Sequence, residues 1–332
     1  MSPSADTPEI SNSADSTVLS LKKSLCSEDS PLPIRFRALF SLKHVATTAD
    51  DDATRVAAIE AIAAGFASPS ALLKHELAYC LGQTGNTAAV KPLRQVLSDL
   101  KEDPMCRHEA AEALGALGWA DNLDILREYR DRKEEDISIV ETCEIAIERI
   151  EWENSAERQK EKLRPSDFAS IDPAPPMPES DKEAEVEDLG RKLMDTNADL
   201  FSRYRAISRL PPDLPTATPA VLALAKGLSD SSALFRHEIA FVFGQLSHPA
   251  SIPALTEALS NTNEASMVRH EAAEALGSLG EKDGVEDTLR KFLHDKEKVV
   301  RESCIVALDI AEYEKGEDAE YALIPESAGA AA

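Results

Sequence analysis

The chain has 332 residues, 5% of them aromatic, and carries 36 Lys+Arg against 60 Asp+Glu, for a formal net charge of -24. This charge argues against nucleic acid or an anionic membrane as the main partner and suits a cationic one. The five cysteines form no CxxC pair, which argues against a disulfide framework or a zinc ribbon. No apolar run reaches transmembrane length and no signal-peptide pattern opens the chain, so we expect a soluble cytoplasmic protein, with the nucleus as a further location.

Residues 1–15 are rich in Ser, Asp and Pro, which predicts a disordered tail. From Ser16 the apolar residues follow a helical period, and Pro31 and Pro33 separate a first helix from a second. The same helix-turn-helix unit then recurs at intervals near 33 residues, which is typical of an α-solenoid of HEAT type. We therefore predict an all-α fold in which residues 16–151 form an N-terminal half of four repeats.

The helical pattern fails over residues 152–185, where Pro173, Pro175, Pro176 and Pro178 stand close together. This composition predicts a flexible linker. Residues 186–316 then repeat the first half as four further units, and 317–332 read as a disordered tail. The expected architecture is eight helical hairpins in two pseudo-symmetric halves. Since no repeat spans the linker, we expect bound metal rather than repeat stacking to hold the halves in register.

A single nine-residue motif occurs four times in this pattern. Residues 107–115 and 269–277 both read RHEAAEALG, and looser copies occupy 74–82 (KHELAYCLG) and 236–244 (RHEIAFVFG). His75 and His108 are 33 residues apart, as are His237 and His270, and the two pairs are 162 residues apart. Each half of the chain thus contains two His-Glu units in tandem, and the two halves are copies of one another.

A histidine in a helix is usually a surface residue or a satisfied core residue, and three observations argue against this interpretation here. At about 100° per residue, Ala110 and Leu114 gather on one face of the helix and His108 and Glu112 on the opposite face. The other copies follow the same rule. In the outer repeats the histidine position holds other residue types, so folding does not require histidine; these are Phe36, Tyr204, Glu141 and Glu302.

The four motifs predict a metal centre. Neighbouring repeats stack helices roughly 8–10 Å apart, so histidines on adjacent helices can meet at one ion. His75 would pair with His108, and His237 with His270. Two imidazoles and a carboxylate with open positions favour non-haem iron, although the ligand types alone also allow copper, manganese or zinc. If the halves face each other, a dimetal centre forms between them.

Other residues with ligand-forming side chains carry less weight. Cys106 has Val268 at its equivalent place, so we interpret it as packing. Tyr79 and Phe241 fall one turn after a histidine on the same face, and they either line a channel for an aliphatic chain or only fill the groove. The remaining histidines are expected in exposed loops or at helix ends; they are His44, His248 and His294.

Over residues 17–315, the four His-Glu dipeptides on paired helical repeats resemble one family, deoxyhypusine hydroxylase, a HEAT-repeat di-iron monooxygenase. The resemblance implies O2-dependent hydroxylation of the deoxyhypusine side chain of eukaryotic translation initiation factor 5A, with an unidentified reductant. It also implies two Fe2+ per chain. The ligand sets carried over to this sequence are His75, His108 and Glu109 for one iron and His237, His270 and Glu271 for the other. The glutamates implied to bind the substrate amines are Glu76 and Glu238.

Two other functions are compatible with parts of this pattern. A HEAT scaffold could grip a basic protein partner with the histidines as a polar lining, and it would keep its affinity without metal. A helical-repeat lyase that attaches bilin pigments shares the repeat type but gives no reason for four His-Glu units. The registered motifs therefore favour the hydroxylase.

Overall fold

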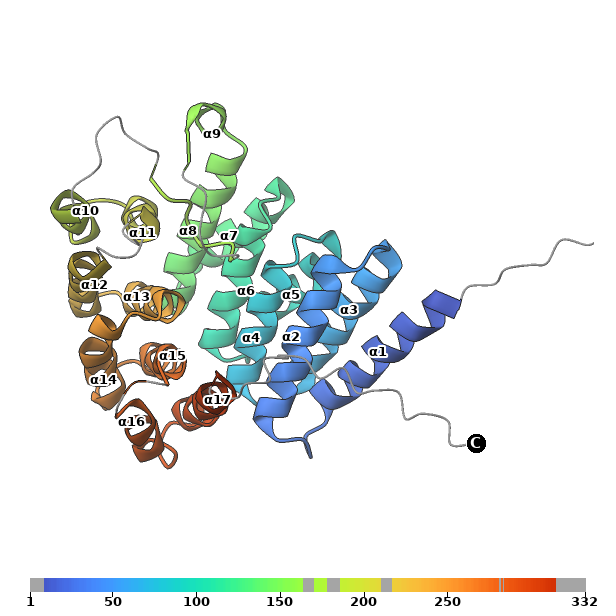
Figure 1. Ribbon diagram of the computed structural model, residues 1–332. Helices are drawn as coiled ribbons and strands as arrows, with labels where there is room; N and C mark the ends of the chain where they lie inside the picture. Colours follow the sequence, from blue (N-terminus) through green and yellow to red (C-terminus); the bar gives the residue numbers. More distant parts are fainter. Residues whose placement is uncertain are drawn as a thin grey trace, which may run out of the picture.

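The computed structural model describes residues 9–163, 170–177, 186–209, 217–280, 282 and 284–314. Every regular element within these residues is helical (Figure 1). No helix among them is both long and apolar enough to cross a membrane. The all-α prediction is confirmed. The predicted tails lie largely outside the described residues, although the first helix already begins at Glu9, seven residues before the expected Ser16.

The first half is built from consecutive helices joined by short turns. Its helices are α1 (Glu9–Cys26), α2 (Leu32–Thr48), α3 (Asp52–Ala64), α4 (Ala71–Gly82), α5 (Val90–Ser98), α6 (Pro104–Ala116), α7 (Leu123–Arg130), α8 (Ile137–Glu153) and the short α9 (Ala156–Lys160). The helical pattern of the sequence predicts helices over 54–65 and 88–100, and the observed α3 and α5 lie within two residues of these bounds. The helical period of the sequence therefore located these elements well.

The second half repeats this order. Its helices are α10 (Val186–Leu193), α11 (Leu200–Arg209), α12 (Ala217–Ala225), α13 (Ala233–Leu246), α14 (Ile252–Ser260), α15 (Ser266–Gly277), α16 (Val285–Lys291) and α17 (Lys298–Glu314). In each half the helices that carry the motif lie on the inside. In the first half α4 packs on α6 and α6 on α8, and in the second half α13 packs on α15 and α15 on α17. These inner helices form the wall that faces the other half (Figure 1).

The two halves contact each other at both ends of this wall. Helix α8 packs on α11 and α13, and α17 packs on α2 and α4 (Figure 1). The contacts obey the duplication, since Ser70 donates to Glu302 (2.8 Å) and Ser232 donates to Glu141 (2.7 Å). The expectation that metal takes the place of helix packing between the halves is therefore wrong, because direct contacts join them at two junctions.

Part of the predicted linker is docked onto both halves. Residues 170–177, which we call the docked segment, include the fully buried Ala174 and bond to Gln83 of the first half and Gln245 of the second. Helix α8 also continues to Glu153, beyond the predicted linker start at 152. For the docked segment the structure shows a fixed path rather than a free one; flexibility elsewhere in 152–185 stays a prediction.

Candidate metal centre

Each of the four motif helices presents its histidine in its second turn. Three of them begin at a side-chain cap: Ser70 accepts from the Leu73 amide, Asp103 from Met105 and Ser232 from Phe235. Such caps satisfy amides that the first turn leaves without a helical partner. The starts of α4, α6 and α13 are thereby fixed, and with them the direction in which His75, His108 and His237 project.

The four histidines converge into one cluster between the halves. The ring centroids of His75 and His108 are 5.5 Å apart, and those of His237 and His270 are 5.4 Å apart. Rings from opposite halves are as close, with 5.0 Å between His75 and His270 and 5.4 Å between His108 and His237. The interpretation of the histidines as a solvated polar face is therefore wrong, since all four are at most 4% exposed.

All eight ring nitrogens of this cluster are buried without a hydrogen-bond partner among the described residues. An unsatisfied buried polar atom costs roughly 1–3 kcal/mol, so eight in one place require an explanation. A carboxylate approaches each half of the cluster: Glu109 lies 3.2 Å from Nε2 of His75, and Glu271 lies 3.4 Å from Nε2 of His237.

Burial lowers the pKa of three of the histidines. The pKa of His237 falls to about 3, and those of His108 and His270 fall well below the usual value, because burial and neighbouring imidazoles both oppose the charged form. Burial also acts on His75, but the carboxylates of Glu109, Glu76 and Glu271 outweigh it and raise its pKa to about 9. Three imidazoles are thus neutral at pH 7 and hold free lone pairs.

Three carboxyl groups near the cluster, those of Glu76, Glu238 and Glu271, have raised pKa values. Burial, followed by the charge of Glu274, raises the pKa of Glu76 to about 8. Burial and neighbouring acids raise those of Glu238 and Glu271 well above the usual range. So many acids in one buried place repel one another, and a bound cation would relieve that repulsion.

These side chains surround a cavity of about 70 Å³. Its lining includes every predicted substrate-binding glutamate, and Tyr79 and Phe241 stand opposite each other in its wall with ring centroids 6.0 Å apart. The pair is part of the cavity wall, and its role as a channel for an aliphatic chain stays a prediction. The eight predicted site residues are all brought together here; their individual roles stay predictions.

The structure adds residues for which the sequence analysis assigned no role. Glu112 and Glu274 follow His108 and His270 by four positions and line the same cavity. Asp172 of the docked segment lies close enough for its charge to raise the pKa values of Glu112 and Glu238. The four-residue spacing was visible in the sequence, whereas nothing in a Pro-rich linker indicated Asp172.

The cysteine and histidines that were expected outside the metal centre do lie outside it. Cys106 is buried and its thiol faces the Ala71 carbonyl at 3.3 Å, which is a packing position. His44 is exposed on α2 rather than in a loop, and His248 caps a short turn by accepting from the Ala250 amide. Neither histidine approaches the cluster.

The donor set fits a redox metal. Neutral buried imidazoles with adjacent carboxylates are ligands for first-row transition metals, and a site without thiolate is unlike a structural zinc site. Nitrogen and oxygen atoms of His237, His270 and Glu271 lie within 4.8 Å of one another, and those of His108, Glu109 and Glu112 form a second, separate group. A third group, of His75, His108 and His237, connects the two. The chain therefore has enough convergent donors for more than one ion.

Comparison with known proteins identifies close relatives. A HEAT-repeat family model matches residues 59–141 and 221–309. The chain is 98% identical to deoxyhypusine hydroxylase of Gibberella zeae over 337 aligned positions, with 100% of each chain covered. It is 72% identical to deoxyhypusine hydroxylase of Neurospora crassa, covering 95% of this chain and 99% of the relative. Among solved structures, human deoxyhypusine hydroxylase in complex with glycerol matches with a TM-score of 0.81 and 42% identity, covering 91% of this chain and 98% of the human one.

Proposed function

The chain belongs to the deoxyhypusine hydroxylase family, and from this premise we propose that it hydroxylates deoxyhypusine with two Fe2+ ions held in the central cavity. The main observation behind this proposal is the cluster of four buried histidines, whose eight ring nitrogens make no hydrogen bond among the described residues. Such a buried cluster is costly for a protein that binds only a basic peptide on its surface. The scaffold alternative therefore has no support from this geometry.

The ligands follow the two halves. One iron would be held by His75, His108 and Glu109, and the other by the equivalent set of His237, His270 and Glu271. The contacts of Glu109 with His75 and of Glu271 with His237 support this division. Rings of opposite halves are equally close, so the two ions would lie together rather than at separate sites.

Bound iron would supply the oxidising power, drawn from O2 and an external reductant, that breaking an unactivated C–H bond requires. In the overall reaction the substrate carbon gains a hydroxyl group, and the second oxygen atom leaves as water after taking up two electrons and two protons. The residues around the cavity exclude bulk water and orient the substrate. Their burial keeps the site free of competing reactions.

Two buried glutamates would bind the substrate's positive charge. The deoxyhypusine side chain is a lysine whose nitrogen carries an aminobutyl group, so it brings two ammonium groups into the cavity. Glu76 and Glu238 are 8% and 4% exposed and line this space, and charge-assisted hydrogen bonds to them would each contribute about 1.5–3 kcal/mol. We propose the deoxyhypusine form of translation initiation factor 5A as the protein that carries this side chain, and the cytoplasm and nucleus as the location.

The proposal is tested on the purified chain. Metal analysis is expected to find two irons per chain, and Mössbauer spectroscopy to find them coupled. A deoxyhypusine-bearing peptide incubated with O2 and a reductant should gain one oxygen atom by mass spectrometry. Full activity in a preparation without iron would refute the iron centre, and an iron-loaded chain that never oxidises the peptide would refute the reaction.

A further inference from the structure

One helical turn after the histidines, the cavity wall contains two carboxylates, Glu112 and Glu274, that belong neither to the proposed iron ligands nor to the proposed substrate-binding residues. One helical turn after each histidine, α4 and α13 present Tyr79 and Phe241, and α6 and α15 present Glu112 and Glu274. All four line the cavity and are partly exposed, whereas the histidines below are buried. Glu112 and Glu274 therefore stand at the rim. They are 162 positions apart, so the duplication makes them equivalent.

The docked segment breaks this equivalence. It is gripped by Gln83 and Gln245, themselves equivalent residues at the ends of α4 and α13. The Ile171 amide donates to Gln83 Oε1 at 2.7 Å and its carbonyl accepts from Gln83 Nε2 at 3.3 Å, while Gln245 Nε2 donates to Ser170 at 2.7 Å. One unsymmetrical stretch of chain is thus held by two symmetrical glutamines, each one helical turn beyond an aromatic residue of the cavity wall.

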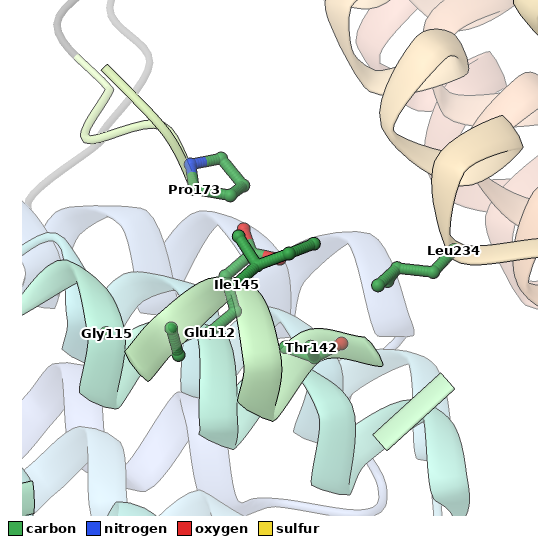
Figure 2. A pocket seen from close by; sticks show the side chains of 7 residues that line it. Glu112, Gly115, Thr142, Ile145, Pro173 and Leu234 are labelled. Atoms are coloured by element: carbon green, nitrogen blue, oxygen red, sulfur yellow. The ribbon is translucent and has the colours of Figure 1, made fainter. Parts of the chain in front are cut away.

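Beyond this crossing the segment turns over Glu112. Pro173 closes a space of about 10 Å³ with Glu112, Ile145 and Leu234, which holds at most about one water molecule (Figure 2). The Glu112 side chain extends from α6 toward Pro173 in this view. The path is fixed on its outer side, because Arg149 donates to the Asp172 carbonyl at 2.5 Å.

The Glu274 side of the rim has a different cover. Among the described residues, the polar neighbours of Glu274 are Ser303 at 3.4 Å and Nδ1 of His270 at 3.7 Å. Its side chain is 20% exposed. Glu274 and the buried Glu76 line the same cavity, and the charge of Glu274 helps to raise the pKa of the Glu76 carboxyl. A partly exposed carboxylate and a buried one therefore face one space on this side.

We propose that Glu274 is a further substrate-binding residue that receives one ammonium group of the substrate, and that the docked segment withholds the equivalent Glu112 from this role. This inference rests on the proposed function. Deoxyhypusine is unsymmetrical, with two ammonium groups separated by four carbons, whereas duplicated helices alone would offer it two equivalent orientations. Covering one rim carboxylate leaves one orientation, in which the inner ammonium meets a buried glutamate and the outer one meets Glu274.

The alternative role of both glutamates is to orient the histidine four residues earlier, as carboxylates behind a metal ligand often do. The duplication makes the two explanations separable. An orienting role predicts equal effects of Glu112→Gln and Glu274→Gln, with loss of iron in both. A substrate role for Glu274 alone predicts unequal effects on substrate binding with iron retained, so each variant is the matched control of the other.

The experiment measures binding of a synthetic deoxyhypusine peptide to the iron-loaded chain by calorimetry, with iron content measured on the same samples. We expect Glu274→Gln to raise the dissociation constant about tenfold or more, as for loss of a charge-assisted hydrogen bond, and Glu112→Gln to change it less than about twofold. Equal weakening, stronger weakening by Glu112→Gln, or loss of iron from Glu274→Gln would overturn the proposal.

A second pair of variants tests the docked segment. A Gln83→Ala/Gln245→Ala/Arg149→Met background removes the side-chain hydrogen bonds that hold residues 170–172 to the two halves, and Glu112→Gln should then weaken peptide binding as Glu274→Gln does. If Glu112→Gln still has no effect there, the segment is not what withholds Glu112. Failure of the proposed function is distinguishable, because a wild-type chain that binds the peptide without oxidising it contradicts the reaction and leaves the binding comparison intact. A wild-type chain that does not bind the peptide overturns both.

Discussion

Helices α2 and α6 are copies of one unit, yet only α6 contributes to the metal centre. Their arginines do the same work: Arg35 Nε donates to the Leu25 carbonyl at 2.8 Å, and Arg107 Nε donates to the Leu97 carbonyl at 3.0 Å. The guanidinium group of Arg35 also pairs with Glu28, between α1 and α2, and that of Arg107 pairs with Glu135, just before α8. Arg35 and Arg107 therefore serve the fold, because each satisfies a carbonyl at the end of the preceding helix.

The next position separates the two helices. Phe36 of α2 is buried in the apolar core, whereas His108 of α6 is fully buried with both ring nitrogens unpaired. In the second half, Tyr204 of α11 is buried in the apolar core and His270 of α15 is buried in the cluster, although the Tyr204 hydroxyl also lacks a hydrogen-bond partner among the described residues. One exchange of side chain on a common frame thus distinguishes a structural repeat from a metal-binding one.

The largest effect is expected when a middle repeat receives the residue of an outer one. His108→Phe should leave the helix and its Arg107 contacts in place, remove at least one iron and lower hydroxylation more than about a hundredfold, since it removes a ligand rather than a group behind one. Iron analysis, peptide oxidation and circular dichroism measure the three parts. The control is His44→Phe on the exposed face of α2; a His108→Phe protein with full iron would contradict the ligand role.

Next in size is the removal of the shared arginine. Arg269 is 1% exposed and pairs with Asp295, whose side chain is 7% exposed. Breaking a buried pair by removing one partner costs about 3–5 kcal/mol, so Arg269→Met should lower the free energy of unfolding by that amount in a denaturant titration. Arg35→Met should cost less, because Glu28 is 52% exposed and stays solvated.

If Arg269 stabilises the fold but does not act on the metal centre, the folded Arg269→Met protein still binds iron at temperatures well below its unfolding transition. Iron loss from the fully folded variant would instead show that the arginine acts on His270 directly. The comparison of Arg269 with Arg35 would then no longer be one of fold stability alone.

The sequence predicted the all-α repeats and the residues of the cluster because both depend on periodicity. His-Glu at a spacing of 33 and then 162 marks one face of one helix four times, and the helices stack in that order. A repeat also shows by contrast which positions folding does not need, as Phe36 and Tyr204 do. Few single motifs provide such an internal control.

The missed features depend on contacts between distant segments. Nothing in the period places α17 against α2, so the closure of the two halves was not predictable from the repeats. The docked segment has no periodicity, and its partners Gln83 and Gln245 lie 88 and 75 positions from the residues they bind. Glu112 had a visible place on the histidine face, but its cover by Pro173 required the folded chain.

The smallest expected effect concerns the glycine that ends the motif. A Cβ at Gly115 would lie 2.7 Å from that of Ala146 on α8, and 2.9 Å from its Cα, so α6 and α8 approach too closely for any side chain there. The corresponding position of α2 holds Lys43, so an outer repeat does not need glycine at this place. The close approach is therefore a property of the middle repeats, where it brings the inner helices together around the cluster.

Gly115→Ala should consequently lower the free energy of unfolding by about 1–3 kcal/mol, the usual cost of overpacking. Gly190→Ala in α10 is the matched control, because its Cβ would meet Ala223 at an ordinary 3.6 Å and alanine favours a helix by about 0.5–1 kcal/mol over glycine. The two substitutions are chemically identical and should shift the unfolding midpoint in opposite directions. Shifts of the same sign would mean that the spacing of α6 and α8 is adjustable, and that the motif's glycine is not what sets the distance between the inner helices.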